Sequence, residues 1–144
     1  AKLFQEATDL YLAEDAGEPT RLLASGETAR ASVEAMLRSN ADLFTREGEP
    51  AGCMLTRAVW TTPDDDPEVS EYLDASVEQR IRDIEVRLER GADDGEELPC
   101  LEVRALAEFF DAIVEGMAVR SIEGASRASL HRIVDLTMRI WDVD

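Results

Sequence analysis

The two C-terminal segments of this chain carry more apolar residues than one face of a helix can hold. Between residues 101 and 122, and again between 126 and 141, apolar side chains recur at helical spacing but cover a band far wider than about 100°. A helix that is apolar on two sides has to be buried on two sides. We therefore expect both helices to lie in a bundle and to leave surface for a partner. The apolar positions are Leu101, Val103, Leu106, Phe109, Phe110, Ile113, Val114, Met117, Ala118 and Ile122, then Leu130, Ile133, Val134, Leu136, Met138, Ile140 and Trp141.

The rest of the chain also follows helical periodicity, and turn residues separate the segments. Helices are predicted over residues 2–14, 27–46 and 66–90. The short apolar stretch 51–60 could be a buried strand or a short helix by periodicity alone, and we interpret it as a helix because no second strand candidate could pair with it. The sequence thus predicts a single all-α domain, residues 1–144, with six helices and no strands.

Particular residues are expected to begin and end these helices. Gly17 and Pro19 are predicted to stop the first helix. Ser25 or Gly26 is predicted to cap the second helix, and Ser126 the last one.

The long helix has its own start signal and a charged outer face. Asp66 is expected to cap it, followed by a proline at the first helical position. Glu78 is spaced to pair with Arg82, and Asp83 with Arg87, on the side away from the apolar stripe.

Acidic residues outnumber basic ones by more than two to one. The chain has 32 Asp and Glu against 15 Lys and Arg, for a formal net charge of −17. Affinity for nucleic acids and anionic membranes depends on Lys and Arg, so we expect these residues to bind neither DNA, RNA nor a membrane surface. No stretch approaches the roughly 20 continuous apolar residues of a membrane span, and there is no secretory signal pattern. With Cys53 and Cys100 interpreted as reduced, the sequence predicts a cytoplasmic protein.

The sequence shows no recognisable catalytic groups. Catalysis needs titratable side chains held together, but His131 is the only histidine, and Ala128 stands where a di-iron Glu-x-x-His motif needs Glu. Cys53 and Cys100 are too sparse for a zinc site. The acidic run 64–66 is better interpreted as a turn before a helix than as a calcium or magnesium site, because it lacks the spacing and glycine of an EF-hand loop. We therefore expect no enzyme activity, no metal and no cofactor.

Several short motifs occur in an order that resembles a known family. The segment from Lys2 to Leu12 is similar to the helix that follows the DNA-binding domain in TetR-type transcriptional regulators. The tetrapeptide Gly-Cys-Met-Leu at 52–55 resembles the opening of the family's sixth helix, and Asp-Pro-Glu-Val at 66–69 resembles the start of its seventh. The two wide apolar segments resemble the eighth and ninth helices.

The resemblance implies both a fold and a mechanism. It implies the C-terminal ligand-binding and dimerisation domain of a bacterial TetR-family repressor, with residues 2–14 continuing from an N-terminal helix-turn-helix domain that this chain is expected to lack. It implies a homodimer joined by a four-helix bundle of the last two helices. A small apolar effector would change the dimer geometry and release operator DNA, which would be bound only through the missing domain.

The resemblance also implies a ligand pocket within residues 27–122, and the surplus apolar area of the last two helices predicts the interface. Asn40 is singled out because an amide on an apolar helix face needs a partner. The same residues could be packed core, so a helical homodimeric interaction module with no ligand pocket is the alternative. An enzyme on a helical bundle would need a polar cluster that the sequence does not show. The predicted ligand-binding residues are Met36, Asn40, Phe44, Leu55, Val59, Trp60, Phe110, Ile113 and Met117. The predicted dimer interface consists of Val114, Ala118, Leu130, Ile133, Val134, Thr137 and Trp141.

Overall fold

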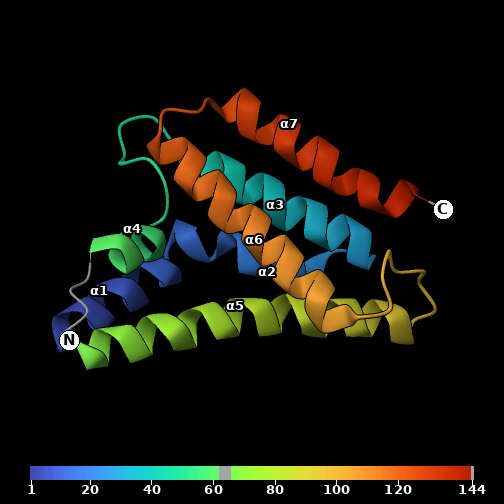
Figure 1. The fold of residues 1–144 in the computed structure, drawn as a ribbon, viewed down its shortest axis with the longest axis horizontal. Coiled ribbons are helices and arrows are strands. Elements are labelled where there is room, and N and C mark those ends of the chain that lie inside the picture. The colour runs from blue at the N-terminus through green and yellow to red at the C-terminus, as the bar shows by residue number, and fades with distance from the viewer. Residues whose placement is uncertain (62–65, 144) are drawn as a thin grey trace.

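The computed structural model describes residues 1–61 and 66–143, and these form an all-α domain (Figure 1). The predicted fold class is confirmed, and no strand occurs in the described ranges. None of the described helices combines the length and apolar character needed to cross a bilayer. The α-helices are α1 (Lys2–Ala13), α2 (Glu18–Ser25), α3 (Ala29–Phe44), α4 (Met54–Thr61), α5 (Pro67–Asp93), α6 (Val103–Ile122) and α7 (Arg127–Met138), and the short 3₁₀ helices are η1 (Asp15–Gly17) and η2 (Arg139–Asp142).

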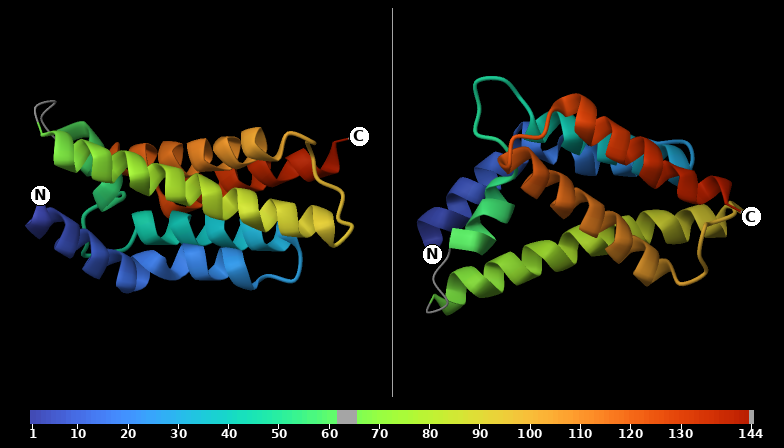
Figure 2. Two further views of the ribbon diagram at one scale, coloured as in Figure 1. Left: turned by 90° about the horizontal axis from the view of Figure 1, so that it is seen from below. Right: turned by 45° about the horizontal axis from the view of Figure 1, so that its top comes forward.

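The helix that sequence reasoning missed is α2. Gly17 and Pro19 were expected to end the first helix and leave a loop, but they bend the chain into a second helix instead. Pro19 lies in the first turn of α2, where the missing N–H has no intrahelical partner to lose. The 3₁₀ turn η1 joins the two helices, so α1 and α2 follow one another along one side of the molecule with a bend between them (Figure 2).

Side-chain caps begin three of the helices. The side chains of Asp66 and Ser126 accept hydrogen bonds from backbone N–H groups in the first turns of α5 and α7, as predicted. The predicted cap of α3 is wrong: Thr28 is the capping residue, and its hydroxyl accepts from the Ala31 N–H at 3.1 Å. Ser25 is not free to cap α3, because it is still part of α2 and its hydroxyl donates to a carbonyl of that helix.

The main core lies where α3 packs against α6 and α7. Figure 1 shows these three helices next to one another, with α5 running along the opposite side. Phe110, Met117, Leu130 and Val134 are fully buried there, which explains most of the wide apolar bands of α6 and α7. A smaller apolar cluster lies under α4, where α4 meets the first half of α5.

The charged face of α5 pairs differently from the prediction. Glu78 forms an ion pair at 2.7 Å with Arg104 of α6 rather than with Arg82. Arg82 pairs with Glu85 at 3.1 Å. Arg87 is buried rather than exposed, and it does not pair with Asp83. The i,i+4 spacing of charges on α5 could not show that α6 supplies the partner of Glu78 or that Arg87 bonds to a residue of α3.

Candidate functional site

A cavity of about 390 Å³ lies between the smaller cluster and the main core. It is enclosed by residues from α1 to α6, so nearly every part of the described chain except α7 contributes to its wall. A volume of this size suits a small organic molecule. The apolar part of the wall includes Leu12, Ala16, Pro19, Leu23, Met36, Leu43, Phe44, Leu55, Ile84 and Val114.

One side of the cavity carries a cluster of charged groups. Arg80 on α5 donates through Nε to Asp111 of α6 at 3.0 Å and through Nη2 to Glu115. Thr56 on α4 donates to the other oxygen of Glu115 at 3.2 Å, so the cluster joins three helices. Burial opposes the charge on the guanidinium, but the hydrogen bond to Asp111 and the negative charges of Asp111 and Glu115 outweigh it and hold the pKa of Arg80 above its usual value.

Tyr11 on α1 lines the cavity near the start of α4. Burial and the neighbouring Cys53 thiol raise the pKa of Tyr11 to about 12. The phenol therefore stays protonated at neutral pH and can both donate and accept a hydrogen bond. The Tyr11 hydroxyl lies next to the side chain of Cys53 and the backbone of Met54, which link it to the start of α4.

The bend between α1 and α2 forms part of the same wall. Leu12, Ala16, Gly17 and Thr20 all line the cavity. Gly17 packs tightly, since a Cβ there would lie 2.2 Å from the Leu12 carbonyl oxygen. A molecule in the cavity would thus touch the segment that sets the direction of α1.

The cavity includes some of the predicted ligand-binding residues and leaves out others. Met36, Asn40, Phe44 and Leu55 line it, and the Asn40 amide donates to the Met36 carbonyl oxygen at 3.1 Å. Other predicted residues lie elsewhere: Val59 and Trp60 are 51% and 70% exposed on the outer face of α4, Phe110 and Met117 are fully buried in the main core, and Ile113 is half-buried against it.

Most of the predicted interface residues lie inside the subunit. Val114 lines the cavity, and Ala118, Leu130, Val134 and Thr137 are buried against neighbouring helices. Ile133 and Trp141 are half-buried, and Trp141 stacks on Phe110 with ring centroids 5.5 Å apart. The physical reason is that α3 covers much of the surplus apolar area that the sequence left unassigned.

Sequence reasoning missed the polar part of the cavity. Arg80, Asp111, Glu115 and Tyr11 come from three different helices and show no local motif. The one available signal was Asp111, a carboxylate inside the apolar band of α6, which needs a cation if it is buried. Within the described ranges, no group of three or more His, Cys, Asp or Glu is placed to hold a metal ion. Of the acidic run 64–66, Asp64 and Asp65 lie outside those ranges.

Known proteins resemble this chain in both sequence and fold. The HTH-type transcriptional repressor ComR of Escherichia coli is 27% identical over 140 residues, which cover 96% of this chain and 67% of that protein. A cysteine mutant of the TetR family transcriptional regulator CifR, complexed with 26-bp double-strand operator DNA, superposes with a TM-score of 0.89 at 28% identity over 96% of this chain and 73% of that one. A second CifR cysteine mutant with operator DNA gives a TM-score of 0.87 at 27% identity over 95% and 71% of the two chains.

The match to a family covers most of the chain. Residues 29–136 match the family described as Tetracyclin repressor-like, C-terminal domain. TetR-family proteins are transcriptional regulators and not enzymes, which agrees with the prediction from the sequence. The chain therefore belongs to the tetracyclin repressor-like C-terminal domain family and is a domain of a TetR-family transcriptional repressor.

Proposed function

We propose that this chain is the effector-sensing and dimerisation domain of a repressor whose operator DNA is released when a small, largely apolar molecule occupies the cavity. The observation that carries the proposal is the 390 Å³ cavity, which has apolar walls and one polar side. Ligand sites typically combine these two features. The alternative, a helical interaction module with no ligand pocket, predicts a packed core without such a cavity.

The bend between α1 and α2 supports the coupling step. In TetR-type regulators, the helix that corresponds to α1 continues from the DNA-binding domain. In this chain, the last turn of α1 and the bend line the cavity. A ligand that contacts Tyr11 would disturb the link between α1 and the start of α4. It can shift the position of α1 only to the extent that it binds one arrangement better than the other.

The outer faces of α6 and α7 support dimerisation. Phe109 and Ile122 on α6 and Leu136 on α7 are 39%, 38% and 67% exposed. Between the first two, Ala112 and Gly116 are exposed and small, and a Cβ at Gly116 would meet nothing within 4 Å. Small residues beside apolar ones let a second pair of helices approach closely, so the proposed homodimer would use these residues in a four-helix bundle.

Binding to the cavity is tested first with phenylnaphthylamine, an uncharged probe that fluoresces in apolar sites. Val114→Phe places a larger side chain on the cavity wall, and Val59→Phe makes the same change on an exposed face of α4. We expect the first variant to weaken probe binding and the second to leave it unchanged. Equal binding to both variants would remove the support for the cavity.

The regulatory step needs the protein with a DNA-binding domain. Operator occupancy is measured by fluorescence anisotropy while a library of small apolar molecules is added. We expect active molecules to release the operator from the parent protein but not from the Val114→Phe form. Sedimentation of Leu136→Glu tests the interface, with Leu101→Glu as the control at a more exposed leucine that precedes α6. A dimer that survives the first change would contradict the proposed interface.

A further inference from the structure

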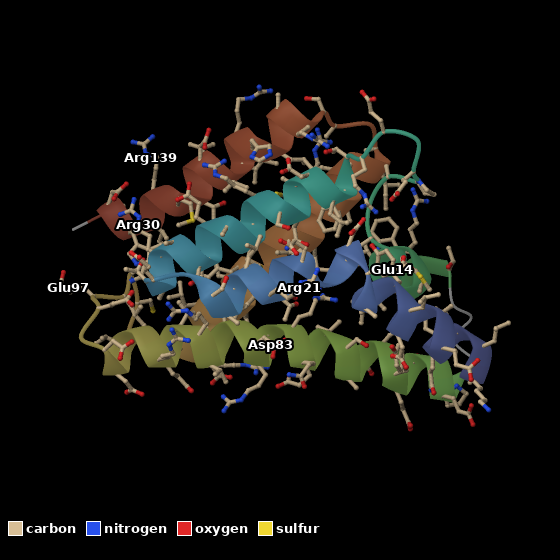
Figure 3. The ribbon with its side chains drawn as sticks, turned by 180° about the vertical axis from the view of Figure 1, so that it is seen from behind. Glu14, Arg21, Arg30, Asp83, Glu97 and Arg139 are labelled. Atoms are coloured by element: carbon tan, nitrogen blue, oxygen red, sulfur yellow. The ribbon has the colours of Figure 1, made fainter. Side chains whose placement is uncertain are left out.

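A second, smaller cavity of about 270 Å³ lies between α2 and α5. Three arginines of α5 line it, namely Arg82, Arg87 and Arg90, together with a single carboxylate, Asp83. Figure 3 shows Asp83 on α5 beside Arg21 on the adjacent helix α2. In a chain with 32 acidic and 15 basic residues, a cavity wall with an excess of cations is the opposite of what the composition favours.

The arginines of this cavity differ in their partners. Arg82 forms ion pairs with Glu85 at 3.1 Å and Glu89 at 3.7 Å. Among the described residues, no carboxylate lies within ion-pairing distance of Arg87 or Arg90. Arg90 is exposed, and its Nη1 reaches the Ala24 carbonyl oxygen at 3.5 Å, the outer limit of a hydrogen bond.

Arg87 is a buried cation with an unused donor. Its residue is 3% exposed, Nε donates to the Ser32 hydroxyl at 3.0 Å, and Nη2 donates to the Gly26 carbonyl oxygen at 3.1 Å. Nη1 is buried and has no hydrogen-bond partner in the part of the chain that the structure describes. A buried charge without a counter-charge destabilises a fold, and an anion bound nearby at Arg90 would supply that counter-charge.

The two cavities are adjacent. Thr20, Leu23, Gln79 and Asp83 line both of them. Asp83, the one carboxylate among the residues that line the smaller cavity, also lines the larger one and accepts a hydrogen bond from Gln79 at 2.8 Å. The three arginines line the smaller cavity alone. A molecule could therefore place an apolar body in the larger cavity and a charged head among the arginines.

We propose that the cavity between α2 and α5 binds the anionic head of an organic acid, with Arg90 in direct contact and Arg87 supplying the buried positive charge behind it. The inference rests on the proposed function, because the apolar body of the molecule occupies the effector cavity. It narrows the effector to an amphipathic anion, such as a carboxylate with an aliphatic tail.

Isothermal titration of the chain with octanoate, and with octanol as the uncharged match, tests the charge requirement. We expect octanoate to bind roughly tenfold to a hundredfold more tightly than octanol, the range of one or two charge-assisted hydrogen bonds. Added salt is expected to weaken octanoate binding and to leave octanol binding unaffected. Inorganic phosphate is expected to compete with octanoate but not with phenylnaphthylamine.

Substitutions of single arginines test which side chain contacts the anion. Arg90→Met removes an exposed side chain and should leave the fold intact, yet weaken octanoate binding roughly tenfold. Arg132→Met, a matched change at an exposed arginine of α7, should have no effect. A neutral substitution of the buried Arg87 could prevent folding, so Arg87→Lys, which retains the positive charge, is used at this position.

Two results would overturn the anion site. One is equal affinity for octanoate and octanol, and the other is octanoate binding that Arg90→Met does not weaken. Neither result contradicts ligand binding in the larger cavity, provided that Val114→Phe weakens phenylnaphthylamine binding and Val59→Phe does not. The failure of the anion site and the failure of the proposed function are thus separate observations.

Discussion

The half of the subunit built on α3, α6 and α7 is close-packed, whereas the half where α1, α2 and α4 meet α5 surrounds a cavity. In the first half, Phe110, Leu130 and Val134 have no exposed surface. In the second half, Val59 and Trp60 of α4 stay exposed, and the smaller cluster has few buried members. We infer that the close-packed half keeps a fixed shape, whereas the half around the cavity can rearrange at a lower cost in free energy.

One of the two largest expected effects comes from the charged cluster that joins the two halves. Arg80→Met leaves Asp111 buried without its cation, and we expect a loss of about 3 kcal/mol in the free energy of unfolding. Arg104→Met is the control, because Arg104 also bridges α5 and α6 but pairs most closely with the exposed carboxylates of Glu78 and Glu108, and its loss should be much smaller. Urea denaturation measures both, and similar losses would show that the Arg80 cluster is not effectively buried.

Two adjacent residues of α3 compare the interior of the main core with the wall of the cavity. Both belong to the main core, but Leu37 has no exposed surface, whereas Met36 also lines the cavity. Leu37→Ala should lower the free energy of unfolding by about 3 kcal/mol. Met36→Ala should cost roughly 1 kcal/mol less, because a side chain beside an empty space has fewer atoms in contact with it. If denaturation curves show the same loss in the free energy of unfolding for both variants, Met36 is packed as densely as Leu37.

A histidine fixes α7 onto α3 in the close-packed half. Arg38 donates to His131 Nδ1 at 3.1 Å, so Nε2 carries the proton and donates to Asp42 at 2.7 Å. His131→Leu removes both bonds, and we expect a loss of about 1 kcal/mol in the free energy of unfolding. The neighbouring exposed change Arg132→Leu should leave stability nearly unchanged. If thermal melting ranks the two variants equally, the histidine does not fasten the helices.

The smallest expected effect at neutral pH concerns Tyr11 at the cavity, because its ionisation changes stability only in alkaline solution. The pKa of Tyr11 is about 12 in the folded chain and 10.0 for an unperturbed tyrosine, so the unfolded chain loses this proton first as the pH rises. The stability from the buried phenol is therefore fully present below pH 10 and falls between about 10 and 12. Cys53→Ala should lower the pKa of Tyr11 part of the way toward its usual value, since burial remains, and Cys100→Ala should not change it. Phenolate absorbance of the Tyr72→Phe protein, in which Tyr11 is the remaining tyrosine, follows the titration.

Periodicity predicted the helices well but not how they face one another. The apolar stripes of α3, α5, α6 and α7 were readable because long helices repeat their pattern several times. On the short helix α4, Leu55, Val59 and Trp60 fit more than one helical face, so the two exposed residues were assigned to the pocket. Asn40 was recognised because an amide in an apolar stripe is a local signal.

Other features depend on tertiary contacts that no local pattern contains. The cluster of Arg80, Asp111 and Glu115 needs α5 and α6 to lie side by side in one register. The wide apolar bands of α6 and α7 showed that two sides are covered but not which side α3 covers, so buried residues such as Leu130 were assigned to a partner subunit. The bend at Gly17 was hidden because the same residues that end a helix can also start the next one.

The bend at η1 makes α1 a lever arm. A helix of 12 residues is about 18 Å long at 1.5 Å per residue. A rotation of roughly 10° at the bend would therefore swing the far end of α1 by about 3 Å. In a two-fold dimer both arms would swing at once, so the two tips could move apart by about 6 Å, a sizeable fraction of the roughly 34 Å between successive major-groove half-sites. A displacement too small to notice inside the cavity would thus be large at the distance where DNA is read.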